Sequence, residues 1–344
     1  MSKPSAMSSM TDRATGALLG VAIGDALGMP SQTLNLEQIR AAYGTITDFT
    51  DAVPDQPVSG GLIAGTITDD TEQSLLLAKI LLDPRGGFDE QRWVEMLLDW
   101  ERDTRARGVN DLLGPSTKRA IEALLKGVPV SQTGRFGTTN GAAMRIIPVG
   151  IAVPPQPLFQ FVSAVEETCR VTHNTSEAIA SAASVAALVS AGVDGASFED
   201  AVPFALEAAR AGERRGTSAT TGRMSDRIEH ALELAKGKSG PDAARDVARK
   251  IGTSVAAIES VPMAFAVVRL SGGDVWKAGL ISANIGDDTD TIGAIACGMA
   301  GAASGVSALP AEKVAQIIRV NRLDVMPIIS GLMKLRESRR EKAA

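Results

Sequence analysis

Gly293-Ala294-Ile295-Ala296-Cys297-Gly298 is an apolar segment in which most side chains are very small, and this composition indicates how the chain folds. A second segment of the same kind is Ala180-Ser181-Ala182-Ala183-Ser184. Helices with small side chains can pack with their backbones close together, so many of them fit into one compact body. These segments predict a protein built from closely packed helices.

Apolar residues recur at spacings of three and four along most of the chain, and glycine or proline stands in most of the gaps. Convincing strand-like alternation of apolar and polar residues is absent from the sequence. The pattern therefore predicts an all-α fold, a single compact orthogonal multi-helix domain. The expected helices span residues 12–28, 71–82, 88–103, 116–126, 157–170, 176–191, 198–209, 224–236, 241–251, 259–270, 274–283, 290–305, 310–320 and 323–335.

The composition shows no break that would divide the chain into two domains. We expect one domain over residues 12–335, preceded by a disordered N-terminal tail, 1–11, and followed by a frayed polar C-terminal tail, 336–344. The chain has 344 residues, of which 44% are hydrophobic and 22% charged, so it can bury a substantial core.

Charge and composition also bear on partners and location. The net charge is -5 with no long basic run, which gives no electrostatic reason to expect nucleic acid or an anionic membrane. A single tyrosine and few other aromatics leave little with which to stack bases. The start lacks the apolar core of a secretory signal, and two cysteines suit a reducing compartment. We predict a cytoplasmic protein without nucleic-acid or membrane partners.

Two acidic clusters lie far apart in the chain, and each runs directly into a predicted helix. They are Thr68-Asp69-Asp70-Thr71 and Asp287-Asp288-Thr289-Asp290-Thr291. Carboxylates this close together repel one another unless a cation or the start of a helix offsets their charge. Carboxylate and hydroxyl oxygens are ligands that suit Mg²⁺, Mn²⁺ or Ca²⁺. The two clusters therefore predict one metal site built from both.

Helix capping is the alternative explanation of each cluster. Asp69 followed by Glu72 before an apolar run is also a capping box, and a cap needs only one carboxylate. One such cluster alone favours a cap, whereas two in one chain favour a metal site. Zinc fits poorly, because no histidine or cysteine is at zinc-ligand spacing. The chain has only His173, His230, Cys169 and Cys297.

Three further segments carry polar groups that could accompany the clusters. Asp25, in the small-residue segment 16–32, is expected either to cap a neighbouring helix or to support the metal site from behind. Residues 134–145 combine glycines and short hydroxyl side chains before a helix, so their backbone N–H groups could face a phosphate. His173 precedes Asn174, a predicted N-cap, and is either structural or in contact with a ligand.

The chain contains five motifs in this order: Gly24-Asp25-Ala26-Leu27-Gly28, Thr68-Asp69-Asp70-Thr71, Asn140-Gly141-Ala142-Ala143-Met144-Arg145, Thr172-His173 and Asn284-Ile285-Gly286-Asp287-Asp288-Thr289-Asp290-Thr291. Together they resemble the ADP-ribosylglycohydrolase family over about residues 12–305. The resemblance implies an all-α fold, a dinuclear Mg²⁺ or Mn²⁺ centre, and a substrate that is an ADP-ribosylated protein or a small ribosylated molecule.

The same resemblance implies roles for individual residues. The metal ligands would be Thr68, Asp69, Asp70, Asp288, Asp290 and Thr291. The substrate pocket would be lined by Gln32, Gly137, Thr138, Thr139, Asn140 and Gly141, with His173 in contact with the ligand. Two cations roughly 3.5–4 Å apart could clamp the 2- and 3-hydroxyls of a ribose and make a bound water more acidic. Hydrolysis of the bond from C1 to nitrogen or oxygen would follow through an oxocarbenium-like state.

Two positions depart from the family pattern. Gln32 stands where members commonly have a glutamate, and an amide cannot act as a general base. Either the base is then a metal-site aspartate, Asp69, Asp70 or Asp290, or the activity differs from the removal of ADP-ribose from proteins. Asp287, where the family usually has glycine, is either the missing carboxylate or an ordinary surface aspartate at a helix start.

The substrate class stays open at the level of sequence. Three stretches resemble a bacterial branch of the family thought to act on small ribosylated or nucleoside-like compounds: Trp100-Glu101, residues 108–118 and Gly137-Thr138-Thr139. Only Phe136, Tyr43 and Trp100 are aromatic candidates near the motifs for stacking an adenine. We expect release of ADP-ribose first, hydrolysis of small ribosides or nucleosides as the alternative, and a catalytically silent ADP-ribose-binding module as a third possibility.

Overall fold

The computed structural model describes residues 6–107, 113–218 and 222–343, and these residues form 18 α-helices, two short 3-10 helices and no strand. The all-α prediction is confirmed. The helices are α1 Ala6–Gly28, α2 Leu36–Tyr43, α3 Asp69–Leu81, α4 Glu90–Ala106, α5 Pro115–Leu125, α6 Val130–Thr133, α7 Gly141–Met144, α8 Ile147–Ala152, α9 Leu158–Cys169, α10 Ser176–Val193, α11 Phe198–Gly212, α12 Met224–Ala235, α13 Gly240–Ile251, α14 Ala257–Leu270, α15 Val275–Ser282, α16 Thr289–Ser304, α17 Ala311–Asn321 and α18 Met326–Ala343; the 3-10 helices are Met29–Ser31 and Val306–Ala308.

Each of the fourteen predicted helical segments corresponds to a helix of the structure. The sequence pattern missed α2, α6, α7 and α8. These have four to eight residues, so fewer than three helical turns are present to show the period of 3.6.

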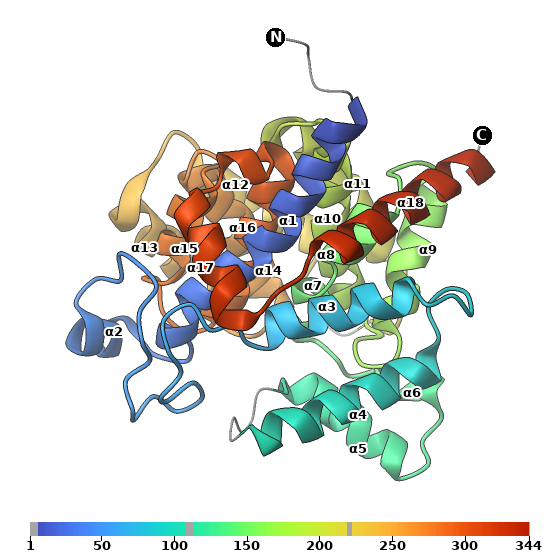
Figure 1. Ribbon diagram of the computed structural model, residues 1–344, viewed down its shortest axis with the longest axis horizontal. Coiled ribbons are helices and arrows are strands. Elements are labelled where there is room, and N and C mark those ends of the chain that lie inside the picture. Colours follow the sequence, from blue (N-terminus) through green and yellow to red (C-terminus); the bar gives the residue numbers. More distant parts are fainter. Residues whose placement is uncertain (1–5, 108–112, 219–221, 344) are drawn as a thin grey trace.

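The helices α1 and α16 form the centre of the molecule and lie side by side (Figure 1). Glycines every fourth residue on α1 let the two backbones approach unusually closely. A Cβ atom on Gly24 would lie 2.0 Å from the carbonyl oxygen of Gly293, and one on Gly28 would lie 2.4 Å from Cα of Asp290. This packing fixes the start of α16, with its acidic cluster, against the end of α1.

Other helices surround this pair. The helix α10 is buried along most of its length beside α16, α8 and α11, while α4, α5 and α6 lie together at one end of the molecule (Figure 1). By length and composition α10 could cross a membrane, but 89% of it is buried inside the protein. That burial is expected of a core helix.

The helices at both ends of the described residues extend further than the sequence pattern predicts. The helix α1 already begins at Ala6, and residues 1–5 and 344 lie outside the described residues. The segment from Arg336, expected as a frayed tail, continues α18 to Ala343. Arg336 is completely buried and donates hydrogen bonds to the carbonyl oxygens of Ile151 and Val153. Carbonyls at a helix end lack partners within the helix, and this guanidinium supplies them for α8.

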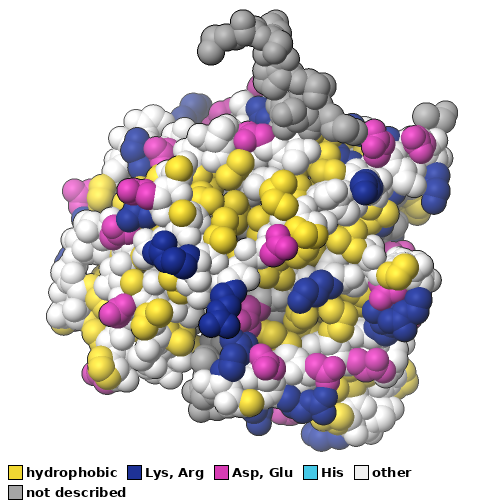
Figure 2. Space-filling model, in the orientation of Figure 1, with side chains coloured by type: hydrophobic (Ala, Val, Ile, Leu, Met, Phe, Trp, Pro, Cys, Tyr) yellow, Lys and Arg dark blue, Asp and Glu magenta, His cyan; other side chains and the backbone are white. Residues whose placement is uncertain are grey.

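Figure 2 shows acidic and basic side chains interspersed on one face of the molecule, with no broad area of a single sign there. Several charged side chains of the described residues pair with oppositely charged neighbours, as Arg102 does with Asp99. Exposed pairs of this kind contribute little to stability. The absence of nucleic-acid partners stays a prediction.

Candidate metal centre

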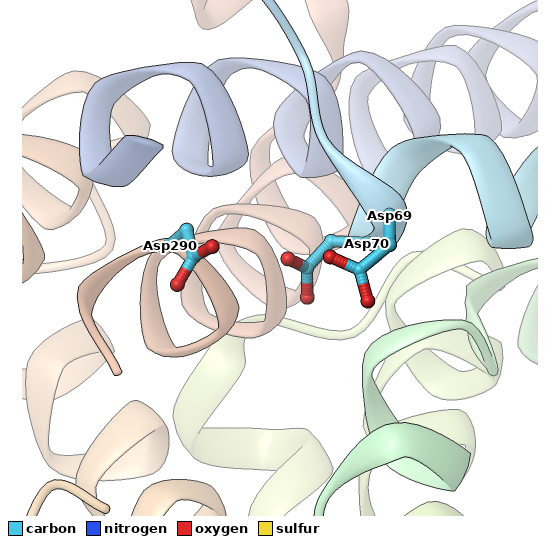
Figure 3. A group of neighbouring side chains, drawn as sticks. All are labelled: Asp69, Asp70 and Asp290. Carbon is cyan, nitrogen blue, oxygen red and sulfur yellow. The ribbon is translucent and has the colours of Figure 1, made fainter. Parts of the chain in front are cut away.

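The structure brings the two acidic clusters together. Asp69 and Asp70 are the first two residues of α3, and Asp290 is the second residue of α16. One carboxylate oxygen from each of the three lies within 4.8 Å of the others. Figure 3 shows the Asp69 and Asp70 carboxylates below the start of α3, with Asp290 beside them on α16.

The carboxylates of this group are short of partners. Both oxygens of Asp70 and Oδ1 of Asp290 are buried and accept no hydrogen bond within the described part of the chain. Burial raises the pKa of Asp70 well above its ordinary value, and the charge of Asp290 raises it further. Burial and then the charge of Asp288 do the same to the pKa of Asp290. Such an arrangement is costly without a compensating positive charge, and hard oxygen donors fit a divalent cation such as Mg²⁺ or Mn²⁺.

Asp25 supports the first cluster from α1. Its carboxylate is completely buried and accepts hydrogen bonds from the backbone N–H and the hydroxyl of both Thr68 and Thr71. Burial raises the pKa of Asp25 to about 6, against the effect of these hydrogen bonds. Asp25 therefore caps the start of α3, and it also fixes the Thr68 hydroxyl. Because that hydroxyl donates its proton to Asp25, its oxygen lone pairs remain for a cation.

Asn140 supports the second cluster. Its amide donates hydrogen bonds to the Asp288 carboxylate and, at 2.9 Å, to the hydroxyl of Ser260. Burial raises the pKa of Asp288 to about 6. The loop before α7 thus holds an aspartate at the start of α16, which joins the third motif of the sequence to the fifth.

A cavity of about 320 Å³ opens onto the two clusters. Of the predicted metal ligands, Asp69, Asp288, Asp290 and Thr291 line it, whereas Thr68 and Asp70 do not. Of the predicted substrate residues, it is lined by Gln32, Thr139, Asn140 and Gly141. Its remaining walls are Thr33, Val58, Leu113, Gly114, Pro115, Thr117, Lys118, Met144 and Val255.

His173 lies behind the cavity wall. Its side chain is completely buried, with Nε2 3.0 Å from the hydroxyl of Thr139 and Nδ1 2.7 Å from that of Thr172. Burial lowers its pKa well below the ordinary value, so the ring is neutral. A Cβ atom on Gly141 would lie 2.9 Å from Cε1 of the ring. His173 therefore positions Thr139 instead of lining the cavity itself.

Arg145 and Gln73 have roles that the sequence did not reveal. The buried Arg145 guanidinium donates to Oε1 of Gln73 at 3.0 Å and to the hydroxyl of Thr172 at 2.7 Å. Gln73 in turn donates to Asp69 at 3.5 Å. This chain of contacts connects the metal cluster to the segment that carries His173. The sequence contains one sign of this role, which is a single arginine between apolar residues of a segment expected to be buried.

The glycines of the loop 134–141 have a packing role. Cβ atoms on Gly134 and Gly137 would lie 2.2 and 2.1 Å from the carbonyl oxygens of Arg170 and Thr172. Neither Gly137 nor Thr138 lines the cavity. The N–H of Asn140, at the end of the loop, donates to Val255. These glycines therefore allow a close contact between the loop 134–141 and the segment 170–172. Only the end of the loop, from Thr139 to Gly141, lines the cavity.

Asp287 is not brought into the carboxylate group. Its side chain is exposed and lines a separate shallow hollow with Thr253. Its backbone pairs with Thr33 and Leu34, at distances of 2.7 and 2.8 Å. Its φ of 67° lies in the left-handed region, which favours glycine and which aspartate tolerates better than most other residues.

None of the three aromatic candidates lines the cavity. Trp100 is buried and donates its indole N–H to Glu72, the hydroxyl of Tyr43 donates to Pro30, and Phe136 is exposed. Of the segment 108–118, residues 108–112 lie outside the described residues. A larger cavity, of about 870 Å³, lies between α2, α13 and α15 and includes none of the predicted site residues.

Comparison with known proteins agrees with this architecture. The model of the family "ADP-ribosylglycohydrolase" matches residues 6–342. The chain is 34% identical over 330 residues to the uncharacterized protein YegU of Escherichia coli (strain K12), covering 96% of this chain and 98% of that protein. It is 29% identical over 317 residues to the ADP-ribosylarginine hydrolase Tri1 of Pseudomonas putida (strain GB-1), covering 89% of this chain and 74% of that protein.

A solved structure shares the fold. It is titled "ADP-ribosylglycohydrolase-related protein complex", has a TM-score of 0.65 at 24% identity, and covers 96% of this chain and 99% of that chain. At this level of identity the likeness bears on the fold alone. The family match extends over nearly the whole chain, and the acidic group lies where α3 and α16 meet. The chain therefore belongs to the ADP-ribosylglycohydrolase family and is a glycosidase of that type.

Proposed function

We propose that this protein is a hydrolase that depends on two divalent cations and cleaves the C1 glycosidic bond of an ADP-ribosylated or ribosylated substrate. The observation that carries the proposal is the group of Asp69, Asp70 and Asp290, with buried oxygens that lack partners. A protein that only bound ADP-ribose would have no need for so many uncompensated carboxylates at one point, which disfavours the silent binding module.

The cations would be Mg²⁺ or Mn²⁺, held by residues of both clusters. When bound, they would clamp the vicinal hydroxyls of a ribose and make a water molecule more acidic. Asp25 orients the hydroxyl of Thr68, and Asn140 orients the carboxylate of Asp288. The proposed ligands are Thr68, Asp69, Asp70, Asp288, Asp290 and Thr291.

We assign the general base to an aspartate of the metal group, Asp69, Asp70 or Asp290. Water attacks C1 as the bond to the leaving group breaks through an oxocarbenium-like state, and the aspartate accepts the proton that water loses. Asp287 is a poorer candidate, because its carboxylate lines another hollow. The Gln32 amide cannot take this role.

Small ribosides remain the second candidate substrate class. The cavity of about 320 Å³ is lined by no aromatic side chain among the described residues, so its walls offer no platform on which an adenine could stack. This observation favours small ribosides or nucleosides. Membership of the family favours substrates that carry ADP-ribose.

The decisive experiment is an incubation of the Mg²⁺-loaded protein with ADP-ribosyl-arginine, ADP-ribosyl-serine, NAD⁺ and simple nucleosides. We expect release of free ADP-ribose or free ribose from at least one of them, and loss of this activity in Asp290→Asn. No release from any substrate by protein shown to bind Mg²⁺ would contradict the proposed hydrolase and favour the silent binding module.

A further inference from the structure

Gln32 is a buried amide in a cavity otherwise dominated by carboxylates. Its side chain is only 6% exposed and lines the same cavity as Asp69, Asp288 and Asp290. Its Nε2 has no hydrogen-bond partner within the described residues. A buried donor without an acceptor costs free energy, so such groups in native proteins usually await a ligand, an ion or a water molecule.

The backbone around Gln32 is firmly held. Its carbonyl oxygen accepts a hydrogen bond of 2.7 Å from the side chain of Gln56. The hydroxyl of the preceding Ser31 donates to the carbonyl oxygen of Ala283 at 2.8 Å. The amide is therefore presented from a fixed point of the cavity wall, as a residue that discriminates between substrates must be.

We propose that Gln32 selects the leaving group, and that it favours one whose departing oxygen or neutral heterocyclic nitrogen can accept a hydrogen bond. The inference rests on the proposed hydrolysis. As the water oxygen bonds to C1, the old C1 bond breaks and its electron pair stays on the departing atom. The Gln32 N–H group donates a hydrogen bond to this growing negative charge and keeps its own proton. The proton that water loses balances the one that the departing group gains.

A guanidinium is the leaving group that this site disfavours. While it is still bonded to C1, it carries several N–H donors, a positive charge and no acceptor. Opposite the Gln32 N–H it would leave two donors facing each other in a buried place, and the neutral amide would not offset its charge. A carboxylate at the same position would reverse both effects.

The test compares ADP-ribosyl-serine with ADP-ribosyl-arginine, which differ only beyond the sugar, and adds uridine as a nucleoside. Three proteins are loaded with Mg²⁺: the wild type, Gln32→Glu and Gln38→Glu. For each we measure kcat/KM and, by calorimetry, the affinity for substrate. Gln38 is the matched control. It lies on the exposed start of α2, lines no wall of this cavity, and uses its Oε1 only to accept from the backbone of Asn35, which a glutamate also does.

We expect the wild type to prefer ADP-ribosyl-serine or uridine over ADP-ribosyl-arginine by about tenfold or more, the effect of one hydrogen bond. Gln32→Glu should change the ratio of kcat/KM for the serine conjugate to kcat/KM for the arginine conjugate by about a hundredfold in favour of arginine. The glutamate no longer donates to the serine oxygen, and it gains an attraction to the guanidinium. Gln38→Glu should leave the ratio unchanged. Activity on uridine without activity on the serine conjugate would assign the departing atom to a heterocyclic nitrogen.

A wild-type preference for the arginine conjugate, or equal shifts in the two variants, would overturn the assignment of Gln32. Calorimetry separates this inference from the proposed hydrolysis. If no substrate is cleaved, the hydrolase proposal fails, yet the relative affinity for the two conjugates and its reversal in Gln32→Glu still decide the role of Gln32. Equal affinity of the wild type for both conjugates would then count against it.

Discussion

At the residue scale, the most unusual feature is the concentration of buried negative charge where α3 meets α16. Asp70 accepts no hydrogen bond from the described residues, and Asp290 leaves one oxygen without a partner. Their immediate neighbours in the sequence are threonines and a further aspartate, and none of these carries a positive charge. In the absence of a cation, repulsion between these buried carboxylates therefore destabilises the folded protein, whereas in the unfolded chain water solvates them.

The first prediction concerns the shared site. Asp290→Asn should weaken the binding of Mg²⁺ or Mn²⁺ to chelator-stripped protein greatly, because one charged ligand common to the group is lost. Calorimetric titration measures this directly. Asp287→Asn is the matched control and should leave metal binding nearly unchanged, since its carboxylate lines another hollow. Unaltered binding in Asp290→Asn would exclude a site that α16 completes.

The second prediction concerns pH. Burial raises the pKa of the site's aspartates, so without metal their contribution to the stability of the folded state is greatest at low pH and is lost as the pH rises. The fall should begin near the ordinary value of 3.8, and for two of these groups it extends to about 6. His173 opposes it, because its pKa is lowered and its contribution is lost as the pH falls. The aspartates are Asp25, Asp69, Asp70, Asp288 and Asp290.

Chemical denaturation at several pH values, with and without Mg²⁺, checks this expectation. The stabilisation that Mg²⁺ gives should grow between about pH 4 and 6, because protons and cations compete for the same oxygens. A benefit from Mg²⁺ that does not change with pH would show that the buried aspartates are not its ligands.

At the scale of elements, close contact between helix backbones places the site. Gly28 of α1 lies against the start of α16, and Asp25, one turn earlier, caps α3. One helix therefore positions both halves of the acidic group. The same helix carries the first of the five sequence motifs, which explains why a motif with one acidic residue accompanies the clusters.

The third prediction follows from this contact. Gly24→Ala should lower the free energy of unfolding by about 3 kcal/mol or more, because its Cβ would lie 2.0 Å from a carbonyl oxygen of Gly293 and neither backbone can move aside alone. Denaturant unfolding measures the change. Gly114→Ala is the control, since a Cβ there meets nothing within 4 Å. A loss below about 1 kcal/mol in Gly24→Ala would show that the helix pair adjusts easily.

The element scale also shows what the sequence could predict. Long helices with a clear period were predictable, and so was the acidic group, because its residues lie in short runs beside helix starts. The roles of Arg145 and His173 were not, since they depend on contacts between loops distant in sequence. The left-handed backbone of Asp287 likewise follows from its pairing with residues 33 and 34.

At the scale of the whole molecule, Arg336 ties the last helix to the interior. Its guanidinium meets the carbonyls at the end of α8 and pairs with Asp194, which follows α10. A charged run near a terminus usually frays, and no pattern in the sequence indicates that one of its arginines is buried. The observed contacts make α18 part of the folded body.

The fourth prediction is that Arg336→Ala destabilises the protein by about 3 kcal/mol or more, because several buried carbonyl oxygens lose their donor at once. Thermal unfolding reports the loss, and limited proteolysis should show cleavage within α18. Arg340→Ala is the control, because Arg340 also pairs with Asp194 but its side chain is exposed to solvent. Similar effects of the two substitutions would assign the contribution to the ion pairs alone.

The pairing of α1 with α16 also has a consequence for synthesis on the ribosome. The helix α1 ends at Gly28 and its main partner α16 begins at Thr289, so about 260 residues are made between the two. Contacts this distant in sequence are slow to form, and until then the glycine-lined face of α1 stays uncovered. Truncated or stalled chains that end before α16 therefore lack both the centre of the fold and the last carboxylate of the site, so this enzyme should become active only after α16 has been made.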